Sequence, residues 1–190
     1  ASFTSTTVCF NNATDFTDAS TTTVGTITGW SWNFGEPSSG ANNLSNLQNP
    51  NQTVVAAGSG NVTLVVTSSG GCVDSVTIPV VVNPLPIASF STTAVCAGSA
   101  MTFTDGSTIS SGSISSWAWN FGDPGSGVNN TSTLQSPSHT YAAAGTYTVT
   151  LTVTSNNGCQ GTTTQIVTVN PIPVAAFTAS TVCTSSATNF

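Results

Sequence analysis

Five cysteines are the residues whose spacing most clearly predicts chemistry in this chain. Cys9, Cys96 and Cys183 follow one another at intervals of 87 residues, and Cys72 and Cys159 are separated by the same interval. No two of them form a C-x-x-C pair and the chain has a single histidine, so the usual zinc ligand sets are missing. The pattern therefore predicts disulfide bonds in an exported chain and no metal site.

The single histidine and the few acids predict structural roles rather than catalysis. Gln52 stands 87 residues before His139, and no triad or ligand set is indicated around either position, so we expect His139 to fasten a turn beside Tyr141. The acids that recur at the 87-residue interval are Asp18 with Asp105 and Glu36 with Asp123. One acid at each turn is fewer than a calcium site or a glycosidase needs, so we expect these carboxylates to accept bonds from nearby backbone N–H groups. The sequence predicts no enzyme and no cofactor.

Two kinds of motif could involve glycans, namely aromatic residues that bind sugars and acceptor sites for glycosylation. Trp30 and Trp32 could stack on sugar rings if they were exposed, but they share parity with Phe34 along a strand and favour the core. Asp74-Ser75-Val76 resembles an acceptor for bacterial O-glycosylation at Ser75, although chance is the stronger explanation. Asn-x-Ser/Thr sequons occur at Asn12, Asn43, Asn51, Asn61, Asn129 and Asn130. Glycans at such positions would give a nearly uncharged surface another route to solubility.

The composition excludes several classes of partner. The 190 residues include no Lys or Arg and six Asp or Glu, for a net charge of -6. The chain therefore cannot neutralise nucleic-acid phosphates or bind an anionic membrane through a basic patch. With 38% hydrophobic residues and a mean hydropathy of +0.18, it has enough apolar material to fold. No apolar run approaches the roughly 18 residues of a membrane span and no basic segment marks a signal peptide, so we expect no membrane insertion and a mature or excised piece of a longer protein.

An internal repeat of 87 residues organises the chain. The hexapeptide WSWNFG at 30–35 returns as WAWNFG at 117–122, and NPLP at 83–86 returns as NPIP at 170–173, without a gap between the copies. Below, repeat 1 denotes residues 1–87 and repeat 2 denotes residues 88–174. The pattern predicts the following units: a domain over 1–83, a proline linker over 84–86, a domain over 87–170, a linker over 171–173 and the start of a third repeat over 174–190. We expect the array to continue.

The apolar residues within a repeat follow a period of two, which is typical of strands. Along 146–154 every second residue is Thr and the others are apolar, which predicts a half-buried strand. Similar strands are predicted over 117–121, around Met101 and Phe103, and over 166–169. Short strands of this kind, separated by Gly-, Ser- and Asn-rich turns, predict an all-β sandwich.

Three motifs of repeat 2 resemble the polycystic-kidney-disease (PKD) domain, an immunoglobulin-like β-sandwich. The motifs are WAWNFGD at 117–123, PSHTY at 137–141 and GTYTVTLTVT at 145–154. Repeat 1 departs from them, with Glu36 in place of the Asp, PNQTV at 50–54 and GSGNVTLVVT at 58–67. The resemblance implies tandem immunoglobulin-like sandwiches in an extracellular array. Copies with the Val-Cys pair and the Asn-Gly-Cys hairpin also look like those of very long bacterial surface proteins, including adhesins and gliding proteins exported by the type 9 secretion route.

The resemblance also bears on how the cysteines pair. In an immunoglobulin-like sandwich, the turn that holds Cys9 or Cys96 lies where the chain leaves the domain, and the hairpin that holds Cys72 or Cys159 lies where it enters. Within one domain these positions would be roughly 20 Å apart, whereas a disulfide needs Cα atoms within about 7 Å. We therefore favour Cys9–Cys159 across the junction, with Cys72, Cys96 and Cys183 pairing outside the fragment. The alternative is Cys9–Cys72 together with Cys96–Cys159.

These observations together favour a structural role. The leading hypothesis is a non-catalytic segment of an extracellular stalk, adhesin or filament, secreted or attached to the cell surface, whose partners are further copies of the same repeat, either in the continuing chain or by self-association into fibres. A disulfide between repeats would stiffen such an array. The alternatives are a glycan- or protein-binding module that uses the loops Ser38–Asn49 and Gly125–Thr133, and an accessory domain of a secreted hydrolase.

Overall fold

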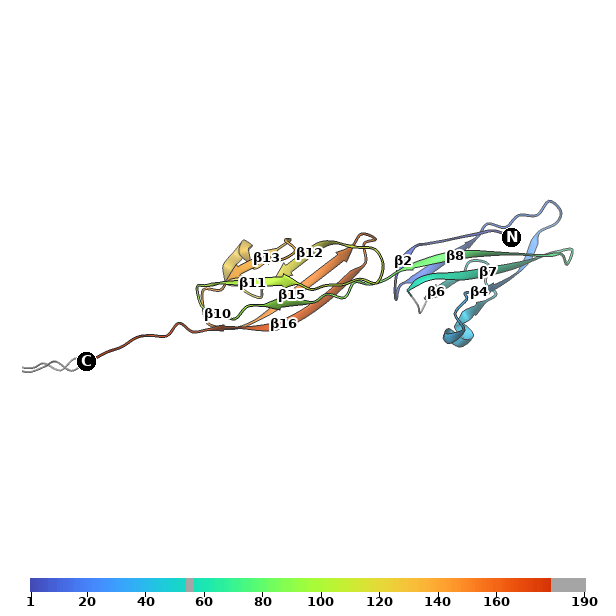
Figure 1. Cartoon of the computed structure of the whole chain (residues 1–190). Helices are drawn as coiled ribbons and strands as arrows, with labels where there is room; N and C mark the ends of the chain where they lie inside the picture. The colour runs from blue at the N-terminus through green and yellow to red at the C-terminus, as the bar shows by residue number, and fades with distance from the viewer. Residues whose placement is uncertain (54–56, 179–190) are drawn as a thin grey trace, which may run out of the picture.

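Two β-sandwiches lie end to end along one axis (Figure 1). The structure is a computed structural model that describes residues 1–53 and 57–178. Each repeat contributes one three-stranded and one five-stranded sheet. The all-β, immunoglobulin-like class predicted from the sequence is confirmed.

Repeat 1 forms the first sandwich. Its small sheet, in the order β1-β3-β6, consists of β1 (Phe3–Ser5), β3 (Ala13–Asp18) and β6 (Asn51–Thr53). Its large sheet, in the order β2-β8-β7-β4-β5, consists of β2 (Val8–Cys9), β8 (Val73–Asn83), β7 (Gly58–Ser68), β4 (Ile27–Asn33) and β5 (Leu44–Ser45).

Repeat 2 has the same strand order. Its small sheet, in the order β14-β11-β9, consists of β14 (Ser138–Thr140), β11 (Ala100–Asp105) and β9 (Phe90–Thr92). Its large sheet, in the order β10-β16-β15-β12-β13, consists of β10 (Val95–Cys96), β16 (Gln160–Asn170), β15 (Gly145–Ser155), β12 (Ile114–Asn120) and β13 (Thr131–Ser132). The degenerate motifs of repeat 1 thus do not alter its topology.

Alternating side chains fill the space between the two sheets of each repeat. The buried residues of β15 are Val149, Leu151 and Val153, and the threonines between them are half-buried on the outer face. Trp119 and Phe103 meet at the centre of repeat 2, with ring centroids 5.5 Å apart. Trp32 and Phe16 form the same contact in repeat 1 at 5.6 Å. Aromatic rings buried in this way contribute much of the apolar area removed from water on folding.

A tight turn after β12 explains the glycine of the repeated Trp-x-Trp-x-Phe-Gly motif. Gly122 has a φ of 70°, and a Cβ there would lie 2.3 Å from the carbonyl oxygen of Thr148. Only glycine accepts both the backbone conformation and the close approach. The chain then forms a short 3-10 segment, which is η2 (Pro124–Asn130) in repeat 2 and η1 (Pro37–Asn43) in repeat 1. These segments were not foreseen, because Gly, Ser and Asn show no apolar period that would indicate a helix.

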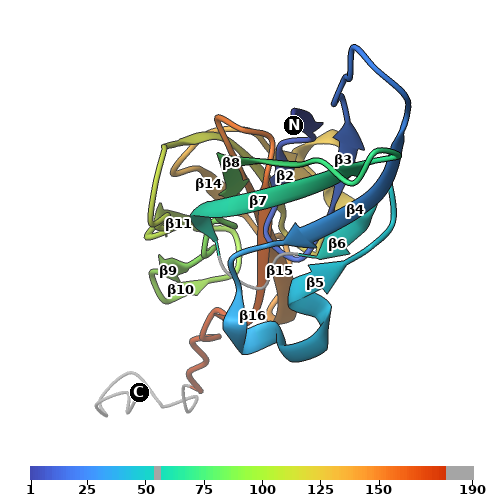
Figure 2. The same cartoon turned by 90° about the vertical axis from the view of Figure 1, so that its right-hand side faces the viewer.

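Strand direction determines where the cysteine-bearing turns lie. β2 pairs in parallel with the end of β8, which places Cys9 opposite Asn83 where the chain leaves repeat 1. In repeat 2, the hairpin between β15 and β16 lies at the end where the chain enters that repeat (Figure 1). Figure 2 looks along the long axis from the far end of repeat 1, with β7 and β4 in front of β15 and β16. The turn of β2 and the hairpin of repeat 2 therefore face each other at the junction.

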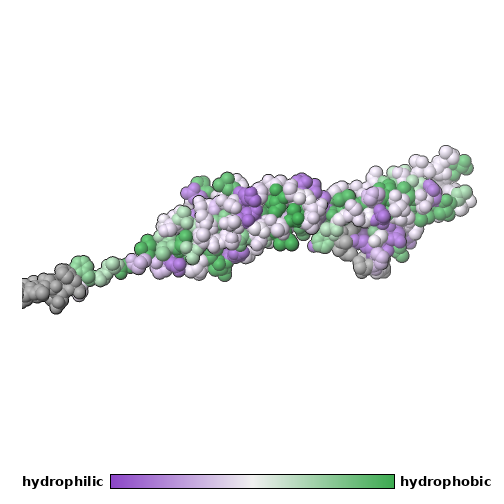
Figure 3. All heavy atoms as spheres, viewed as in Figure 1, coloured by the Kyte–Doolittle hydropathy of each residue, from purple (hydrophilic) through white to green (hydrophobic). Residues whose placement is uncertain are grey.

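The surface is largely uncharged. Residues of intermediate hydropathy dominate the face seen in Figure 3, and hydrophobic residues are scattered among them. Within the strands and loops of repeat 2 up to Asn170, the most exposed large apolar side chains are Val128 and Ile166, at 89% and 74% exposure. No helix among the described residues is long and apolar enough to cross a bilayer.

Candidate functional site

A disulfide between the repeats is the most distinctive chemical feature of the molecule. It joins Cys9 to Cys159, whose Cα atoms are 5.5 Å apart although the two residues are 150 positions apart in the sequence. Cys9 ends β2 of repeat 1, and Cys159 lies in the hairpin just before β16 of repeat 2. The bond therefore crosses the junction between the two sandwiches.

Further contacts surround the disulfide. Asn157 Nδ2 of the repeat 2 hairpin donates to Asn83 Oδ1 at the end of β8, at 3.0 Å. Ile87 and Thr108 form a backbone bridge in which each N–H donates to the carbonyl of the other, at 2.7 and 3.0 Å. Cys159 is only 1% exposed. The junction is therefore held by the disulfide and these hydrogen bonds as well as by the linker.

Gly161 allows the linker to approach repeat 2 closely. A Cβ at this position would lie 1.9 Å from the carbonyl oxygen of Pro86, and Pro86 itself is buried. Any other residue would displace either the linker or the hairpin. At the equivalent position of repeat 1 stands Asp74, which is exposed. The two repeats thus present different surfaces at the ends where the chain enters them.

The other cysteines are distributed between the two far ends of the molecule. Cys72 lies in the hairpin between β7 and β8, and Cys96 ends β10 opposite Asn170; both are exposed free thiols. The pairs Cys9–Cys72 and Cys96–Cys159 are absent, because Cys9 and Cys159 are bonded to each other. Cys183 lies outside the described residues.

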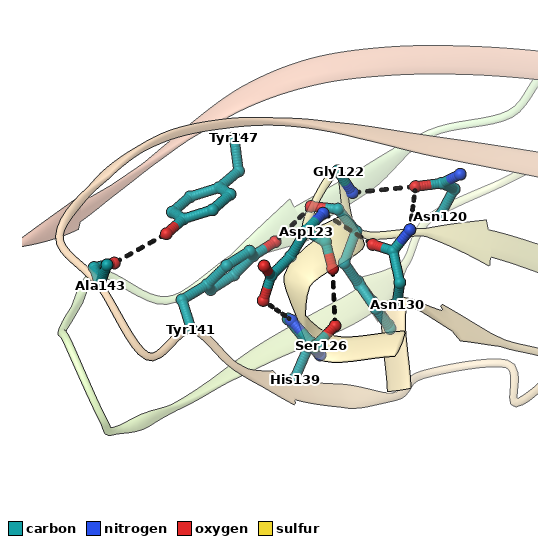
Figure 4. A network of polar contacts seen from close by, with 10 residues as sticks. Asn120, Gly122, Asp123, Ser126, Asn130, His139, Tyr141, Ala143 and Tyr147 are labelled. Carbon is teal, nitrogen blue, oxygen red and sulfur yellow. Dashed lines mark hydrogen bonds and ion pairs between the residues drawn. The ribbon is translucent and has the colours of Figure 1, made fainter. Parts of the chain in front are cut away.

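His139 belongs to a buried aromatic cluster (Figure 4). Its Nε2 lies 3.1 Å from Asp123 Oδ2, and its ring stacks on Phe121 with centroids 4.5 Å apart. Tyr141 packs edge-on against it and donates its hydroxyl to the Phe121 carbonyl at 2.9 Å. Burial raises the pKa of Tyr141 well above its ordinary value, with contributions from Asp123 and Tyr147. The cluster attaches β14 to the turn after β12. His139 is only 5% exposed within it, so its surroundings are those of a structural residue.

Asp105 and its counterpart Asp18 each bind a tryptophan of the opposite sheet. Trp117 Nε1 donates to Asp105 Oδ2 at 2.8 Å, and Trp30 Nε1 donates to Asp18 Oδ2 at the same distance. Partial burial acts to raise the pKa of Asp105, but the bonds from Ser107, Gln135 and Trp117 together outweigh it and leave the pKa below its ordinary value. The same balance lowers the pKa of Asp18.

These indole bonds link the two sheets of each repeat and were not foreseen. The expected local bonds are present as well, since the backbone N–H groups of Ser20 and Ser107 donate to Asp18 and Asp105. Trp32 and Trp119 are buried in the core as expected, whereas Trp30 and Trp117 are half-buried. Over residues 1–53 and 57–178, no three His, Cys, Asp or Glu side chains gather where they could hold a metal ion.

The positions predicted for glycosylation differ in accessibility. Asn43 and Asn130 are engaged in the turns after β4 and β12, where their Oδ1 atoms accept the backbone N–H of Glu36 and Asp123 at 2.6 and 2.7 Å. The exposed candidates are Asn12, Asn51, Asn61, Asn129 and Ser75. Modification at these exposed positions stays a prediction.

A groove of about 370 Å³ lies beside η2 in repeat 2. It is lined by Ser126, Asn129, Thr131, Leu134, Ser138 and His139, among others. Part of this lining belongs to the loop Gly125–Thr133, one of the two loops considered for binding. Its hydroxyl and amide groups could form hydrogen bonds with a neutral polar ligand.

The family model of the PKD domain matches residues 83–171, which include all the strands of repeat 2. The PKD1 domain of Vibrio anguillarum Epp is 33% identical over 47% of this chain and 99% of that domain, with a TM-score of 0.42. The chain belongs to the PKD-domain family. A PKD1 domain from the Vibrio cholerae metalloprotease PrtV is 34% identical over 45% of this chain and 98% of its own length, with a TM-score of 0.40.

Another solved structure that resembles this PKD protein is described as carbohydrate-binding modules from the β-sandwich superfamily. It is 30% identical over 47% of this chain but only 36% of its own length, with a TM-score of 0.42. The comparison with curated proteins finds no match. The resemblance drawn from the three motifs of repeat 2 is thus confirmed at the level of the family.

Proposed function

We propose that this chain is a non-catalytic structural segment of an extracellular surface stalk, adhesin or filament built from tandem PKD repeats. This role is supported by the junction. There the Cys9–Cys159 disulfide, the buried Pro86 and the Asn157–Asn83 hydrogen bond hold the two sandwiches in one relative orientation. An array that must set a distance needs fixed junctions, because flexible ones would let successive units fold back on each other.

We also propose how the chain is divided into domains and where it is located. The units run over 1–83 and 87–170, with proline linkers over 84–86 and 171–173 and the start of a third repeat over 174–190. The partners are further copies of the repeat. A disulfide suits an oxidising compartment, so the location is extracellular, secreted or attached to a bacterial surface. The type 9 route, with adhesin or gliding proteins as its cargo, is the specific setting that the sequence resemblance implies.

Small-angle X-ray scattering tests the fixed junction. We expect the oxidised protein to have a single elongated distance distribution. The double variant C9S/C159S should give a broader one with a smaller mean extension, whereas C72S/C96S, which removes two thiols away from the junction, should match the wild type. A wild-type distribution as broad as that of C9S/C159S would contradict the proposal.

Peptide mapping under non-reducing conditions tests the pairing directly. The chain has no Lys or Arg, so trypsin has no site and chymotrypsin or pepsin must be used. We expect a peptide pair that contains Cys9 and Cys159. Recovery of Cys9 joined to Cys72 would contradict the disulfide between the repeats. The linker prolines would then be the remaining source of rigidity at the junction.

The groove beside η2 favours a glycan-binding module as the second candidate. The solved structure described as carbohydrate-binding modules is 30% identical over the part it shares with this chain, which adds support. Glycan-array binding that is lost in Asn129→Ala but kept in Asn42→Ala, the equivalent change in repeat 1, would favour this candidate. The accessory domain of a secreted hydrolase is a third candidate, and a PKD domain of a metalloprotease is among the similar structures.

A further inference from the structure

Thr14 of β3 carries a buried hydroxyl group without a hydrogen bond. The residue is 0% exposed, and among the residues that the structure describes its Oγ1 is the single buried side-chain oxygen or nitrogen that has no partner. A hydroxyl normally keeps a partner when it leaves water, because burial otherwise removes its bonds to solvent without replacing them. Met101 occupies the equivalent position of repeat 2, so the fold accepts an apolar side chain at this site. The hydroxyl of Thr14 is therefore not required by the fold.

The residue directly opposite Thr14 on the neighbouring strand is Gln52. β3 and β6 are antiparallel, and Thr14 is the register partner of Gln52 just as Met101 is the partner of His139 in repeat 2. Directly opposite residues of an antiparallel pair extend from the same face of the sheet, with Cβ atoms about 5 Å apart. The Thr14 hydroxyl and the Gln52 amide therefore share the core face of the small sheet of repeat 1.

The amide of Gln52 is held only by a local bond among its printed contacts. Its Nε2 donates to the carbonyl oxygen of Thr53 at 3.2 Å, which is at the long end of the usual range for an N–H donor. Gln52 is half-buried, so its side chain lies between the core and solvent. Turning the amide towards Thr14 costs little more than this one bond.

Glu36 supplies a carboxyl group from the turn that adjoins β6. Its backbone N–H donates to an asparagine side chain at 2.6 Å, as that of Asp123 does at 2.7 Å, so the two acids occupy equivalent places in the same kind of turn. In repeat 2 the Asp123 carboxylate lies 3.1 Å from Nε2 of His139 (Figure 4). Repeat 1 has Gln52 in place of this histidine, and Glu36 is only 8% exposed. An acid, an amide and a hydroxyl are thus gathered at one side of the core.

We propose that Thr14 and Gln52 form an ester cross-link between β3 and β6, with Glu36 transferring the proton. The bridge places Oγ1, Cδ and Cγ between the two Cβ atoms, which suits the roughly 5 Å that separates opposite Cβ atoms in an antiparallel pair. The modification goes beyond the structural role proposed above, because it lies inside repeat 1 and does not involve the junction.

The reaction needs no oxidant and no cofactor. Thr14 Oγ1 attacks Gln52 Cδ and gives its proton to the Glu36 carboxylate, which then passes the proton to Nε2 as ammonia leaves. The Oγ1–Cδ bond forms, the Cδ–Nε2 bond breaks, and Glu36 ends in its initial state. The fixed register of the two strands replaces a chance encounter of the reacting groups. Burial of Thr14 keeps water from the ester once it has formed.

Repeat 1 lacks the contacts that hold the corresponding strand of repeat 2. β14 is attached through the aromatic cluster of His139, whereas β6 has Gln52 at that position. β6 is only three residues long and is an edge strand that pairs with β3 alone. A covalent bond to Thr14 would hold β6 to its sheet in place of the aromatic contacts.

Intact-mass spectrometry of the purified, reduced chain tests the cross-link. We expect the wild type to weigh less than its sequence mass by one ammonia. Thr14→Val, which keeps the shape of the side chain, and Gln52→Met should have their full sequence masses. Thr17→Val changes an exposed threonine of the same strand and should still show the loss of ammonia. A wild type with its full sequence mass, or a Thr14→Val variant that still lacks one ammonia, would overturn the proposal.

Peptide mapping distinguishes the ester from a succinimide at Asn157-Gly158, which would also lose one ammonia. We expect peptic digests to contain two peptides joined through Thr14 and Gln52. Hydroxylamine should separate them and leave a hydroxamate at position 52. A loss of ammonia confined to the peptide that contains Asn157 would overturn the proposal. The Cys9–Cys159 pair is read from the same digest without reductant, so failure of the ester and failure of the fixed junction are distinguishable.

The role of Glu36 is tested by the rate of ammonia loss after protein isolated in urea is refolded at neutral pH. Glu36→Gln should slow this loss at least about a hundredfold, because the proton then lacks its carrier. Asp15→Asn removes an exposed acid next to Thr14 and should leave the rate unchanged. An unchanged rate in Glu36→Gln would overturn the assignment of proton transfer to Glu36.

Discussion

Asp105 joins the two sheets of repeat 2 through the indole of Trp117, and this bond makes stability depend on pH. Since the folded-state pKa of Asp105 is lowered, its contribution is present above the unfolded pKa of about 3.9 and is lost as pH falls through the folded value. We expect Asp105→Asn to lower the free energy of unfolding at neutral pH by about 1 kcal/mol, a small value for a charged hydrogen bond because the site is partly exposed.

Urea unfolding at neutral and at strongly acidic pH measures this dependence. The gap between Asp105→Asn and the wild type should close in acid, because both then carry an uncharged side chain. Asp15→Asn removes the same charge at an exposed position away from the indoles and is the matched control. An equal gap at both pH values would show that the charge of Asp105 does not contribute.

Gly161 is the residue on which the internal junction depends most directly. Gly161→Asp, which introduces the residue found in repeat 1, should push the Pro86 carbonyl away and disfavour the Cys9–Cys159 bond. We expect a less stable disulfide in glutathione buffers and unchanged cores. Gln160→Asp adds the same charge at the neighbouring exposed position and should have little effect. A disulfide of wild-type stability in Gly161→Asp would mean that the linker can take another path.

At the scale of strands, repeat 2 holds β14 and β15 with an aromatic cluster that repeat 1 lacks. Gln52 replaces His139 and Gly60 replaces Tyr147, whose ring lies 4.0 Å from that of Tyr141 between centroids. We expect backbone amides of β7 to exchange hydrogen faster than those of β15, because local opening costs less where fewer apolar contacts are broken.

Hydrogen exchange followed by peptic digestion and mass spectrometry measures this difference. Tyr147→Gly should bring the exchange of β15 towards that of β7. Slower exchange in β7 than in β15 in the wild type would contradict the assignment of the aromatic cluster as the source of stability.

The strands were predictable to the extent that their two faces differ. The strict alternation over 146–154 predicts β15 almost to its ends, because one face is core and the other is solvent. β16 begins at Gln160 rather than near Ile166. Its first half lies at an open sheet edge, where Thr occurs on both faces of the strand, so the apolar period of two is absent there. The facing positions of Cys9 and Cys159 were expected only through the strand directions that the resemblance to an immunoglobulin-like sandwich implies.

The bonds between sheets were harder to predict. Side chains that meet across a sandwich leave no local pattern, and Trp117 could be assigned to the core on parity alone. One signal was available, because Asp18 precedes Trp30 by 12 residues just as Asp105 precedes Trp117. Equal spacing of a donor and an acceptor in two copies of a repeat is the kind of pattern that would indicate such a bond.

For the molecule as a whole, open sheet edges and the absence of cations predict association. Within the described part of the chain, β10 covers β16 only at Val169 and Asn170, so the edge from Gln160 to Thr168 has no further strand beside it. No lysine protects this edge, and with no Lys or Arg in the chain there are no such cations whose attraction to a neighbouring molecule salt could weaken. We expect lateral association that is insensitive to salt.

Light scattering on protein with blocked thiols tests this expectation. Thr164→Lys places a charge on the open edge strand and should weaken association, whereas Thr150→Lys places it on the adjacent inner strand β15 and should weaken it less. Monodisperse monomers at high concentration, with and without salt, would exclude edge pairing.

Tension applied to the two ends of the oxidised chain would bypass most of the protein. From Cys9 the force passes through the disulfide to Cys159, so residues 10–158 between them carry no tension even if their strands separate. Only the residues before Cys9 and those after Cys159, including β16, can be drawn out. Reduction would release the slack, at roughly 3.5 Å for each residue that unravels. Stretching of single molecules should therefore show long extensions only in the presence of reductant, because the Cys9–Cys159 bond limits the maximum length of the oxidised chain.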